Sequence, residues 1–100
     1  MKIAIESKYL VLVKDIIKSI LQDNNLKIFV FGSRAKGNAR QYSDLDIGLR
    51  SSNDKIDLKK LSKIELSLED TTIPYKVDVV DLNNISDSFK SHIEHDLVEI

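Results

Sequence analysis

The sequence predicts an α/β (α+β) protein built on a mixed β-sheet with flanking helices, as a single domain over residues 1–100. Three observations predict this class. Apolar residues recur at helical spacing in separate segments, short β-branched and aromatic runs lie between those segments, and the two patterns alternate along the chain. One hundred residues suffice for one domain with a real core and are too few for a second.

The first predicted helix spans residues 9–21 and ends before Asn24-Asn25. Its apolar face has the three- or four-residue spacing of a helix and consists of Leu10, Val13, Ile17, Ile20 and Leu21. A strand over 26–31 follows. A short helix or loop then leads to a second strand over 44–50.

The second half of the chain continues the alternation. A turn at 51–54 supplies helix-capping residues for a helix over 55–70. The apolar stripe of that helix consists of Leu58, Leu61, Ile64 and Leu68. Pro74, the only proline, marks the entry to a strand over 75–82, and a last helix is predicted over 87–98.

A pair of acidic residues, Asp44 and Asp46, lies on the strand predicted over 44–50. Residues two apart point to the same side of a strand, so both carboxylates project together while the intervening apolar residues face a core. Like charges held so close repel each other unless a cation lies between them, and Mg²⁺ prefers such oxygen ligands. Gly48, on the same face, leaves room beside the pair. The pair therefore predicts a site for one or two Mg²⁺ ions.

A turn of small residues, Gly32 and Ser33, follows the short buried strand upstream of the acidic pair. A glycine lets backbone N–H groups approach an anion closely, and the serine adds a hydroxyl donor. The next eight residues carry three basic side chains, Arg34, Lys36 and Arg40, and no acid. A basic loop beside an acidic strand is the polarity expected for a nucleoside triphosphate bound through Mg²⁺.

A third acid is expected from the strand over 75–82. Asp78 lies between two valines and therefore points to the opposite face, and a mid-strand carboxylate is costly to bury without a charged partner. Asp78 is expected either to bind a metal or to take a proton from an attacking hydroxyl as general base. Asp81 is three residues from Asp78 and so faces the opposite side of the strand. It lies at the strand end, where it is expected to cap the following turn. Asp78 is therefore preferred as the third acid.

A Gly-Ser turn, an Asp-x-Asp pair and a later isolated Asp on a strand resemble the DNA polymerase β nucleotidyltransferase superfamily. Within it, the short chain resembles the minimal nucleotidyltransferases, the antitoxin partners of HEPN-type ribonuclease toxins. The resemblance implies a small nucleotidyltransferase fold in which Gly32 and Ser33 hold the triphosphate. It further implies that Mg²⁺ binding and catalysis depend on Asp44, Asp46 and Asp78.

The resemblance also implies that Arg34, directly after the serine, and Lys36 contribute to nucleotide binding. The reaction it implies is Mg²⁺-dependent transfer of AMP from ATP, with release of pyrophosphate, to a tyrosine hydroxyl of a cognate HEPN toxin. That modification would silence the ribonuclease activity of the toxin. The toxin is accordingly the expected protein partner, in a hetero-oligomer with this chain.

Two alternative functions stay open at this point. The protein could be a non-catalytic antitoxin that neutralises its partner by contact and uses the nucleotide site only structurally. It could instead be a small-molecule nucleotidyltransferase of the aminoglycoside type. Intact acids at Asp44, Asp46 and Asp78 argue against the first alternative, because a binding module has no need of them.

Composition excludes several other classes. The formal net charge of −1 gives no support for a nonspecific nucleic-acid binder, which usually carries a basic excess. The chain contains no cysteine, which excludes thiolate chemistry and a disulfide scaffold and agrees with a reducing cytoplasm. No segment has the apolar length of a signal peptide or a membrane span. We therefore expect a cytoplasmic protein that contacts neither membranes nor nucleic acid directly.

Several side chains are expected to carry no chemistry. His92 and His95, three residues apart on the last predicted helix, have no third ligand nearby in sequence and are interpreted as a solvated face. Ser43 is expected to position the turn at Asp44. For Tyr42 two interpretations stay open: it stacks on a base or contacts the acceptor, or it packs on its own surface. Ordinary surface charge accounts for a run of lysines that acids interleave: Lys55, Lys59, Lys60 and Lys63. No residue is clearly placed to read a base edge.

Overall fold

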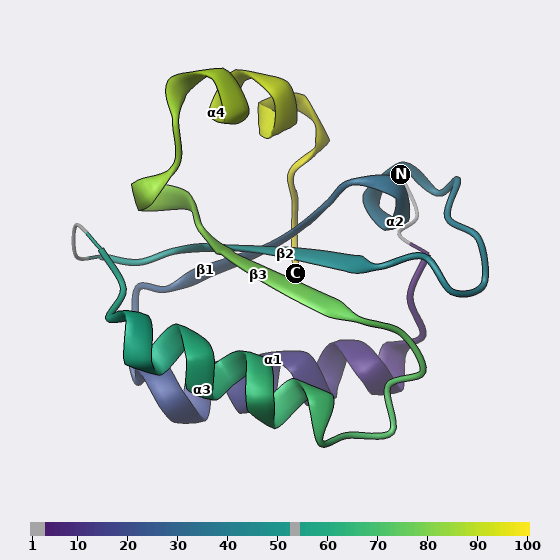
Figure 1. The fold of residues 1–100 in the computed structure, drawn as a ribbon, viewed down its shortest axis with the longest axis horizontal. Coiled ribbons are helices and arrows are strands. Elements are labelled where there is room, and N and C mark those ends of the chain that lie inside the picture. The colour runs from purple at the N-terminus through teal and green to yellow at the C-terminus, as the bar shows by residue number, and fades with distance from the viewer. Residues whose placement is uncertain (1–3, 53–54) are drawn as a thin grey trace.

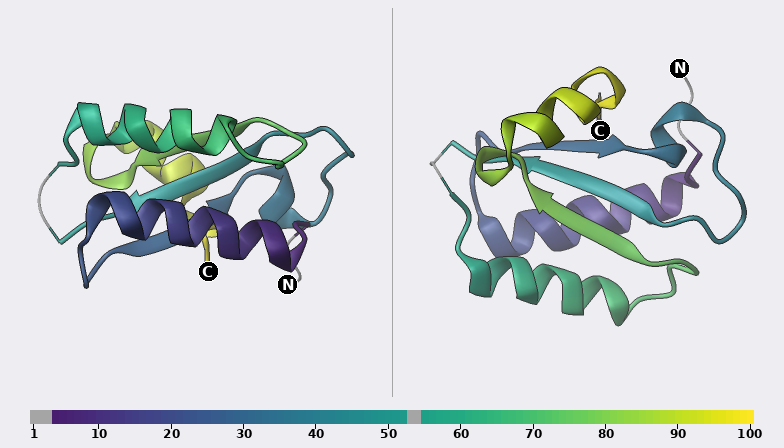
Figure 2. Two further views of the ribbon diagram at one scale, coloured as in Figure 1. Left: turned by 90° about the horizontal axis from the view of Figure 1, so that it is seen from below. Right: turned by 45° about the horizontal axis from the view of Figure 1, so that its top comes forward.

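The computed structural model describes residues 4–52 and 55–100, and within them a sheet lies between two layers of helices (Figure 1). The elements are, in chain order, α1 Ser7–Leu21, β1 Lys27–Phe31, α2 Ser33–Lys36, β2 Leu45–Arg50, α3 Leu58–Glu69, β3 Val77–Asp81, η1 Leu82–Asn84, α4 Asp87–Ile93, η2 Glu94–Asp96 and β4 Val98–Glu99, where η marks a 3₁₀ turn. Helices α1 and α3 lie side by side under one face of the sheet, and α4 covers part of the other face (Figure 2). The predicted α/β class, a mixed sheet with flanking helices, is confirmed.

The sheet is mixed, with the strand order β3-β2-β1-β4. Strand β1 pairs antiparallel with both β2 and β4, whereas β2 and β3 run parallel. A parallel pair needs a crossover connection, and α3 supplies it. As a result the end of β1 meets the beginnings of β2 and β3: Phe31 is opposite Asp46, which in turn is opposite Asp78.

The main core lies between the sheet and the layer formed by α1 and α3. Strand alternation turns Val30 of β1 and Ile47 and Leu49 of β2 to this face, where each is 0% exposed. The two helices contribute their amphipathic faces to this core, through Val13, Ile17, Ile64 and Leu68. Burial of the apolar residues of β2 on this side turns Asp46 to the opposite face of the sheet.

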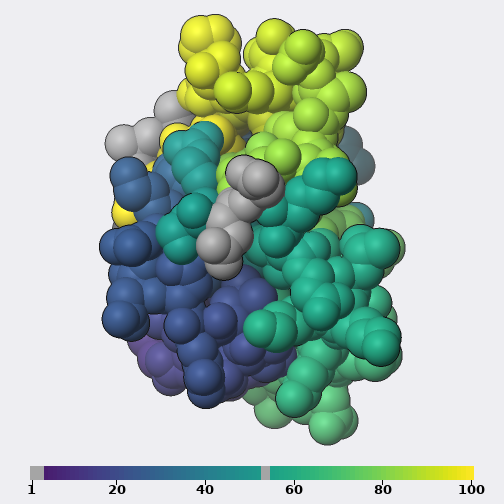
Figure 3. All heavy atoms as spheres, turned by 90° about the vertical axis from the view of Figure 1, so that its left-hand side faces the viewer, coloured from purple at the N-terminus to yellow at the C-terminus, as the bar shows by residue number. Residues whose placement is uncertain are grey.

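A smaller apolar cluster covers the opposite face, and its buried members are Phe29, Phe31, Leu82 and Ile93. It fixes η1 and α4 on the sheet. Ser86 is the N-cap of α4, and its side chain accepts a hydrogen bond from the Phe89 N–H at 3.1 Å. In the space-filling view α4 and η2 form the top of the molecule, on the side away from α1 (Figure 3).

The predicted last helix over 87–98 is wrong at its C-terminal end. Helix α4 ends at Ile93, and after η2 the chain runs as β4 beside β1. Val98 pairs with Val30, and the N–H of Ile100 donates to a backbone carbonyl of β1 at 2.9 Å. The edge of β1 has free backbone groups, and residues 98–100 can form hydrogen bonds with them only as a strand and not as part of a longer helix. The helical spacing of apolar residues in the sequence gives no sign of that edge.

Helix α3 begins at Leu58 rather than at residue 55. Asp57 is its N-cap, and the Asp57 side chain accepts a hydrogen bond from the Lys59 N–H at 2.8 Å. The capping residues expected at 51–54 therefore do not start this helix, and Asn53 and Asp54 of that turn lie outside the described residues.

The capping role expected of Asp81 is confirmed. Its carboxylate accepts hydrogen bonds from the Asn83 N–H at 3.0 Å and from the Ile56 N–H at 2.8 Å. Asp81 is only 7% exposed, so these backbone donors replace the water that its charge has lost. The carboxylate thereby ties the approach to α3 to the end of β3.

The helices of this fold are short, and the longest, α1, has 15 residues. Among the helices of residues 4–52 and 55–100, none combines the length and the apolar character needed to cross a membrane.

Candidate active site

Strand pairing brings two of the predicted acids, Asp46 and Asp78, together. They are directly opposite each other on the parallel strands β2 and β3. Their strand neighbours Leu45 and Val77 are buried in the main core, so both carboxylates lie on the face away from α1 and α3. Sequence alternation predicts the face of each acid, and the strand register explains why residues far apart in sequence become neighbours.

Burial raises the pKa of the Asp46 carboxyl above its ordinary value, and the negative charges of Asp78 and Asp44 raise it further. Both other predicted acids therefore lie close enough to act on Asp46, although Asp44 is exposed on the loop ahead of β2. The folded state disfavours the ionised form of Asp46, so its charge destabilises the fold at neutral pH. A cation between the carboxylates would remove this cost.

Lys76 supplies a positive charge beside the acids. Its Nζ lies 3.4 Å from Oδ1 of Asp78. Hydrogen bonding to Asp78, and then the charges of Asp78 and Asp44, raise the pKa of the Lys76 ammonium. Both side chains are partly exposed, so the ion pair is weak and a metal ion can displace it. Sequence reasoning missed Lys76, although its position two residues before Asp78 places both on one strand face.

The oxygen donors of this site suit a hard dication. Mg²⁺ commonly binds through one or two carboxylates together with substrate phosphates rather than in an all-protein cage. Within the part of the chain that the structure describes, no three Asp, Glu or His side chains stand together as such a cage. Asp46 and Asp78 lie on paired strands, and Asp44 lies on the adjoining loop. This donor set fits an ion that is completed by substrate phosphates.

Gly32 makes room for Asp46. Its φ of 76° lies in the region that side-chain-bearing residues rarely adopt, and a Cβ at this position would overlap Oδ2 of Asp46. The sequence assigned this glycine to the close approach of an anion. The structure adds a second requirement, because the Asp46 carboxylate occupies the space beside it. The Gly-Ser turn and the acidic pair therefore form one packed unit.

Gly48 does not leave an open space, as the sequence suggested. An added Cβ would meet the side chain of Leu82 at 2.9–3.0 Å, so Leu82 fills the space above this glycine. Leu82 belongs to the apolar cluster under α4. The absence of a side chain at Gly48 therefore lets the η1 turn pack directly on the sheet. Leu82 of that turn closes the acidic site at this position.

Arg34 lines a different hollow from Asp46 and Asp78. It is 6% exposed, and its guanidinium donates to the carbonyl of Ala4 at 2.7 Å and to that of Ser43 at 2.8 and 3.0 Å. The same guanidinium lies over the ring of Tyr75, 3.6 Å from the ring centroid. Tyr75 is half-buried and, with Arg34, lines a hollow separate from that of the acids. These contacts hold the loop that ends at Asp44, and the nucleotide-binding role of Arg34 stays a prediction.

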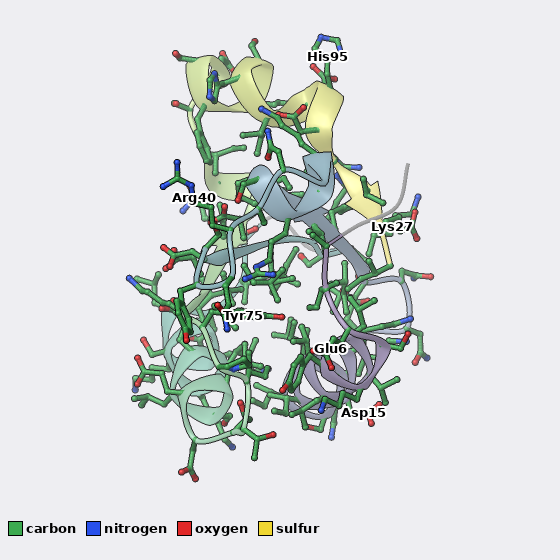
Figure 4. All side chains as sticks on the ribbon, turned by 90° about the vertical axis from the view of Figure 1, so that its right-hand side faces the viewer. Glu6, Asp15, Lys27, Arg40, Tyr75 and His95 are labelled. Atoms are coloured by element: carbon green, nitrogen blue, oxygen red, sulfur yellow. The ribbon has the colours of Figure 1, made fainter. Side chains whose placement is uncertain are left out.

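Ser43 closes the turn before Asp44, as expected. Its hydroxyl accepts a hydrogen bond from the Arg40 N–H at 2.9 Å, and its own N–H donates to the Arg40 carbonyl at 3.1 Å. The side chain of Arg40 projects outward (Figure 4), and Tyr42 is 71% exposed. The turn therefore positions Asp44 through the Ser43 hydroxyl and a backbone hydrogen bond between Ser43 and Arg40.

An open cleft of about 540 Å³ lies beside the acids, between the Gly-Ser turn and α4. Four of the predicted site residues line it: Gly32, Lys36, Asp46 and Asp78. Lys36 reaches across to η2, where its Nζ lies 3.2 Å from Oδ2 of Asp96. Two further residues on the α4 side of the cleft are Phe89 and His92. A volume of this size is in the range of small-molecule sites.

His92 is exposed, as its interpretation as part of a solvated helix face requires, and it also lines this cleft. His95 points away from the cleft at the top of the molecule (Figure 4), so the two histidines do not share a site. No sequence signal joined His92 to the acids, because the fold of α4 back over the sheet depends on the second apolar cluster.

The comparisons with known proteins agree with this geometry. The family model described as polymerase beta, nucleotidyltransferase matches residues 14–100. The probable protein adenylyltransferase MntA of Haemophilus influenzae is 32% identical over 89 residues, which cover 89% of this chain and 75% of MntA. The chain therefore belongs to the polymerase beta nucleotidyltransferase family. Its class is that of enzymes that transfer nucleotidyl groups.

Solved structures share the fold. The structure of a toxin-antitoxin with AMP-PNP is 25% identical to this chain, with a TM-score of 0.67 over 86% of this chain and 70% of that one. The structure of a tri-AMPylated Shewanella oneidensis HEPN toxin in complex with MNT antitoxin is 21% identical, with a TM-score of 0.61 over 89% of this chain and 69% of that one.

The first prediction concerns the charge of Asp46. Asp46→Asn removes a negative charge that the fold disfavours, so at pH 7 in EDTA we expect the variant to melt at a higher temperature than the wild type. The pKa of Asp46 is raised from its ordinary value of 3.8, so lowering the pH toward 3.8 protonates the wild-type carboxyl and closes the gap. Thermal melts across pH 4–7, with the exposed acid variant Asp15→Asn as control, measure this; a lower melting temperature for Asp46→Asn at pH 7 would contradict it.

The second prediction concerns Gly32. Gly32→Ala combines a positive φ with overlap on Asp46, so we expect a loss of about 1–3 kcal/mol in the free energy of unfolding. We also expect Mg²⁺ with ATP to stabilise the wild type and to stabilise this variant less, because the carboxylate must move. Gly37→Ala has a similar φ of 78° and is the matched control. Denaturant unfolding with and without Mg²⁺ and ATP checks both effects, and unchanged ligand stabilisation in Gly32→Ala would refute the proposed packing role.

Proposed function

We propose that this protein transfers AMP from ATP to a tyrosine hydroxyl of a HEPN toxin partner and thereby acts as its antitoxin. The observation that carries the proposal is the pairing of Asp46 with Asp78 across adjacent strands, facing a cleft next to Gly32. Similarity to the probable protein adenylyltransferase MntA supports protein as the acceptor and AMP as the transferred group.

In the proposed reaction the triphosphate lies against Gly32, Ser33 and Lys36, with Asp44 and Asp46 binding Mg²⁺. Bound there, Mg²⁺ would neutralise the carboxylates and the phosphate oxygens and so stabilise the charge of the transition state. The acceptor oxygen forms a bond to the α-phosphorus while the bond to pyrophosphate breaks, and pyrophosphate leaves. Asp78, beside Asp46, takes the proton of the acceptor hydroxyl or joins the metal ligands.

Lys36 changes partner in this proposal. In the structure its ammonium pairs with Asp96 across the cleft, and the Lys36 side chain is 49% exposed. A triphosphate offers more negative charge than one carboxylate, and charge-assisted contacts to phosphate are strong. The ion pair between Lys36 and Asp96 therefore breaks when ATP binds. Its loss widens the part of the cleft that lies between α2 and η2.

The HEPN toxin is proposed as partner because several solved structures with this fold are toxin-antitoxin complexes. One of them contains a tri-AMPylated HEPN toxin with its MNT antitoxin. Another carries AMP-PNP, which supports a nucleoside triphosphate as substrate. The tyrosine as acceptor and the dependence on Mg²⁺ are the finer parts of the proposal and need the experiment that follows.

The third prediction is label transfer to the partner. The protein, co-purified with its toxin, is incubated with α-labelled ATP and Mg²⁺. We expect the toxin band to be labelled with the wild type and the label to fall at least about 100-fold with Asp44→Asn/Asp46→Asn, since removing a single transition-state-stabilising group costs about that much. The exposed pair Asp15→Asn/Asp70→Asn is the matched control for two lost charges, and mass spectrometry identifies the modified residue.

The same experiment separates the alternatives. If ATP binds and no protein is labelled, a non-catalytic antitoxin remains, and the double variant should then still neutralise the toxin in cells. Transfer of the label to an aminoglycoside in place of the toxin would indicate a small-molecule enzyme. Omission of Mg²⁺ should abolish the labelling, and undiminished transfer in EDTA would refute the metal-dependent mechanism.

A further inference from the structure

One wall of the cleft has no part in the chemistry described above. This wall is the inner side of α4, where Phe89, His92 and Ile93 line the cleft. Phe89 and His92 are three residues apart and therefore occupy neighbouring positions on one face of the helix. Ile93 is buried in the apolar cluster and fixes this face toward the sheet.

Phe89 is a large apolar side chain that stays 37% exposed. Its ring packs edge-to-face against Phe31, with centroids 6.2 Å apart and ring planes at 77°. Phe31 is the last residue of β1, directly before Gly32. The Phe89 ring is thus anchored close to the Gly-Ser turn, while part of its surface remains available to a ligand in the cleft.

The cleft is charged at one end and has the Phe89 ring on its α4 wall. The charged end lies where β1 ends and β2 begins, with Lys36 and Asp46. Two further carboxylates line the cleft, Glu65 of α3 and Asp96 of η2, and the latter pairs with Lys36. Along β3 the floor changes from Asp78 to Val80, which packs with the cluster under α4. A nucleoside triphosphate has the same two-ended character, a polyanionic chain joined to a planar base.

We propose that Phe89 and His92 form the nucleobase subsite of the cleft. The base stacks on the exposed part of the Phe89 ring, and the imidazole of His92 lies at its edge, where it can donate or accept a hydrogen bond. Stacking on an aromatic side chain accepts every base, and His92 adds the contact that discriminates among them. This inference rests on the proposed function, because it requires the triphosphate to lie at Gly32 and Lys36.

The test compares two ligands that differ in the base. Calorimetry measures the affinity of the co-purified complex for ATP and for tripolyphosphate, both with Mg²⁺. We expect Phe89→Ala to weaken ATP binding by about 5- to 100-fold, the range that loss of base stacking gives, and to leave tripolyphosphate binding unchanged. Phe89→Tyr keeps the ring and should keep most of the ATP affinity.

His92→Ala is the second variant, since His92 is exposed and its replacement leaves the apolar cluster intact. We expect it to reduce the preference for ATP over the other nucleoside triphosphates. Lys90→Ala, an exposed position on α4 that lines a different hollow, is the matched control and should change neither affinity.

Unchanged ATP affinity in both Phe89→Ala and His92→Ala would overturn the inference, as would an equal loss of ATP and tripolyphosphate binding. Normal ATP affinity combined with loss of toxin labelling would also overturn it, because the wall would then serve the acceptor. The proposed function fails separately: if the wild type binds ATP through this wall and labels no toxin, the nucleobase subsite stands without the transfer reaction.

Discussion

The mutual repulsion of two carboxylates, Asp46 and Asp78, is the constraint on which the rest of the structure depends. Packing of β2 and β3 against α1 and α3 holds them opposite each other, and burial, followed by the charges of Asp78 and Asp44, raises the pKa of Asp46. Lys76 offsets part of the charge from the open edge of the sheet. The fold thus keeps an acidic pair that it does not neutralise by itself, and this is the state expected of a site that binds a cation together with its substrate.

The segments around this pair are arranged to keep it accessible. Gly32 has no side chain that would displace Asp46, and Arg34 fastens the loop before Asp44 through backbone carbonyls and the ring of Tyr75. On the other side α4 is raised above the sheet on its own small apolar cluster (Figure 1). The open space between the Gly-Ser turn and α4 is the cleft, so the position of the last helix sets the size of the substrate that fits.

The sequence predicts the acidic face because local alternation decides it: with Leu45 and Ile47 in the core, Asp46 has to point the other way. The role of Asp81 as a cap was likewise readable from its parity and its place at a strand end. Local sequence patterns do not reveal which distant segments pair with each other. Strand β4 returns beside β1 because β1 has an open edge, and His92 lies at the cleft because a second apolar cluster holds α4 on the sheet. Neither the open edge nor the cluster produces a periodic pattern in the sequence.

The most direct test of the account is to locate the bound cation. Mn²⁺ accepts the same oxygen ligands as Mg²⁺ and broadens the NMR signals of nuclei close to it. In the presence of a non-hydrolysable ATP analogue, we predict that Mn²⁺ broadens the backbone signals of Gly32, Asp46 and Asp78 first, leaves those on the outer faces of α1 and α3 sharp, and has no such effect on the Asp44→Asn/Asp46→Asn variant. Broadening centred elsewhere, or equal broadening in that variant, would contradict a metal site at the paired acids.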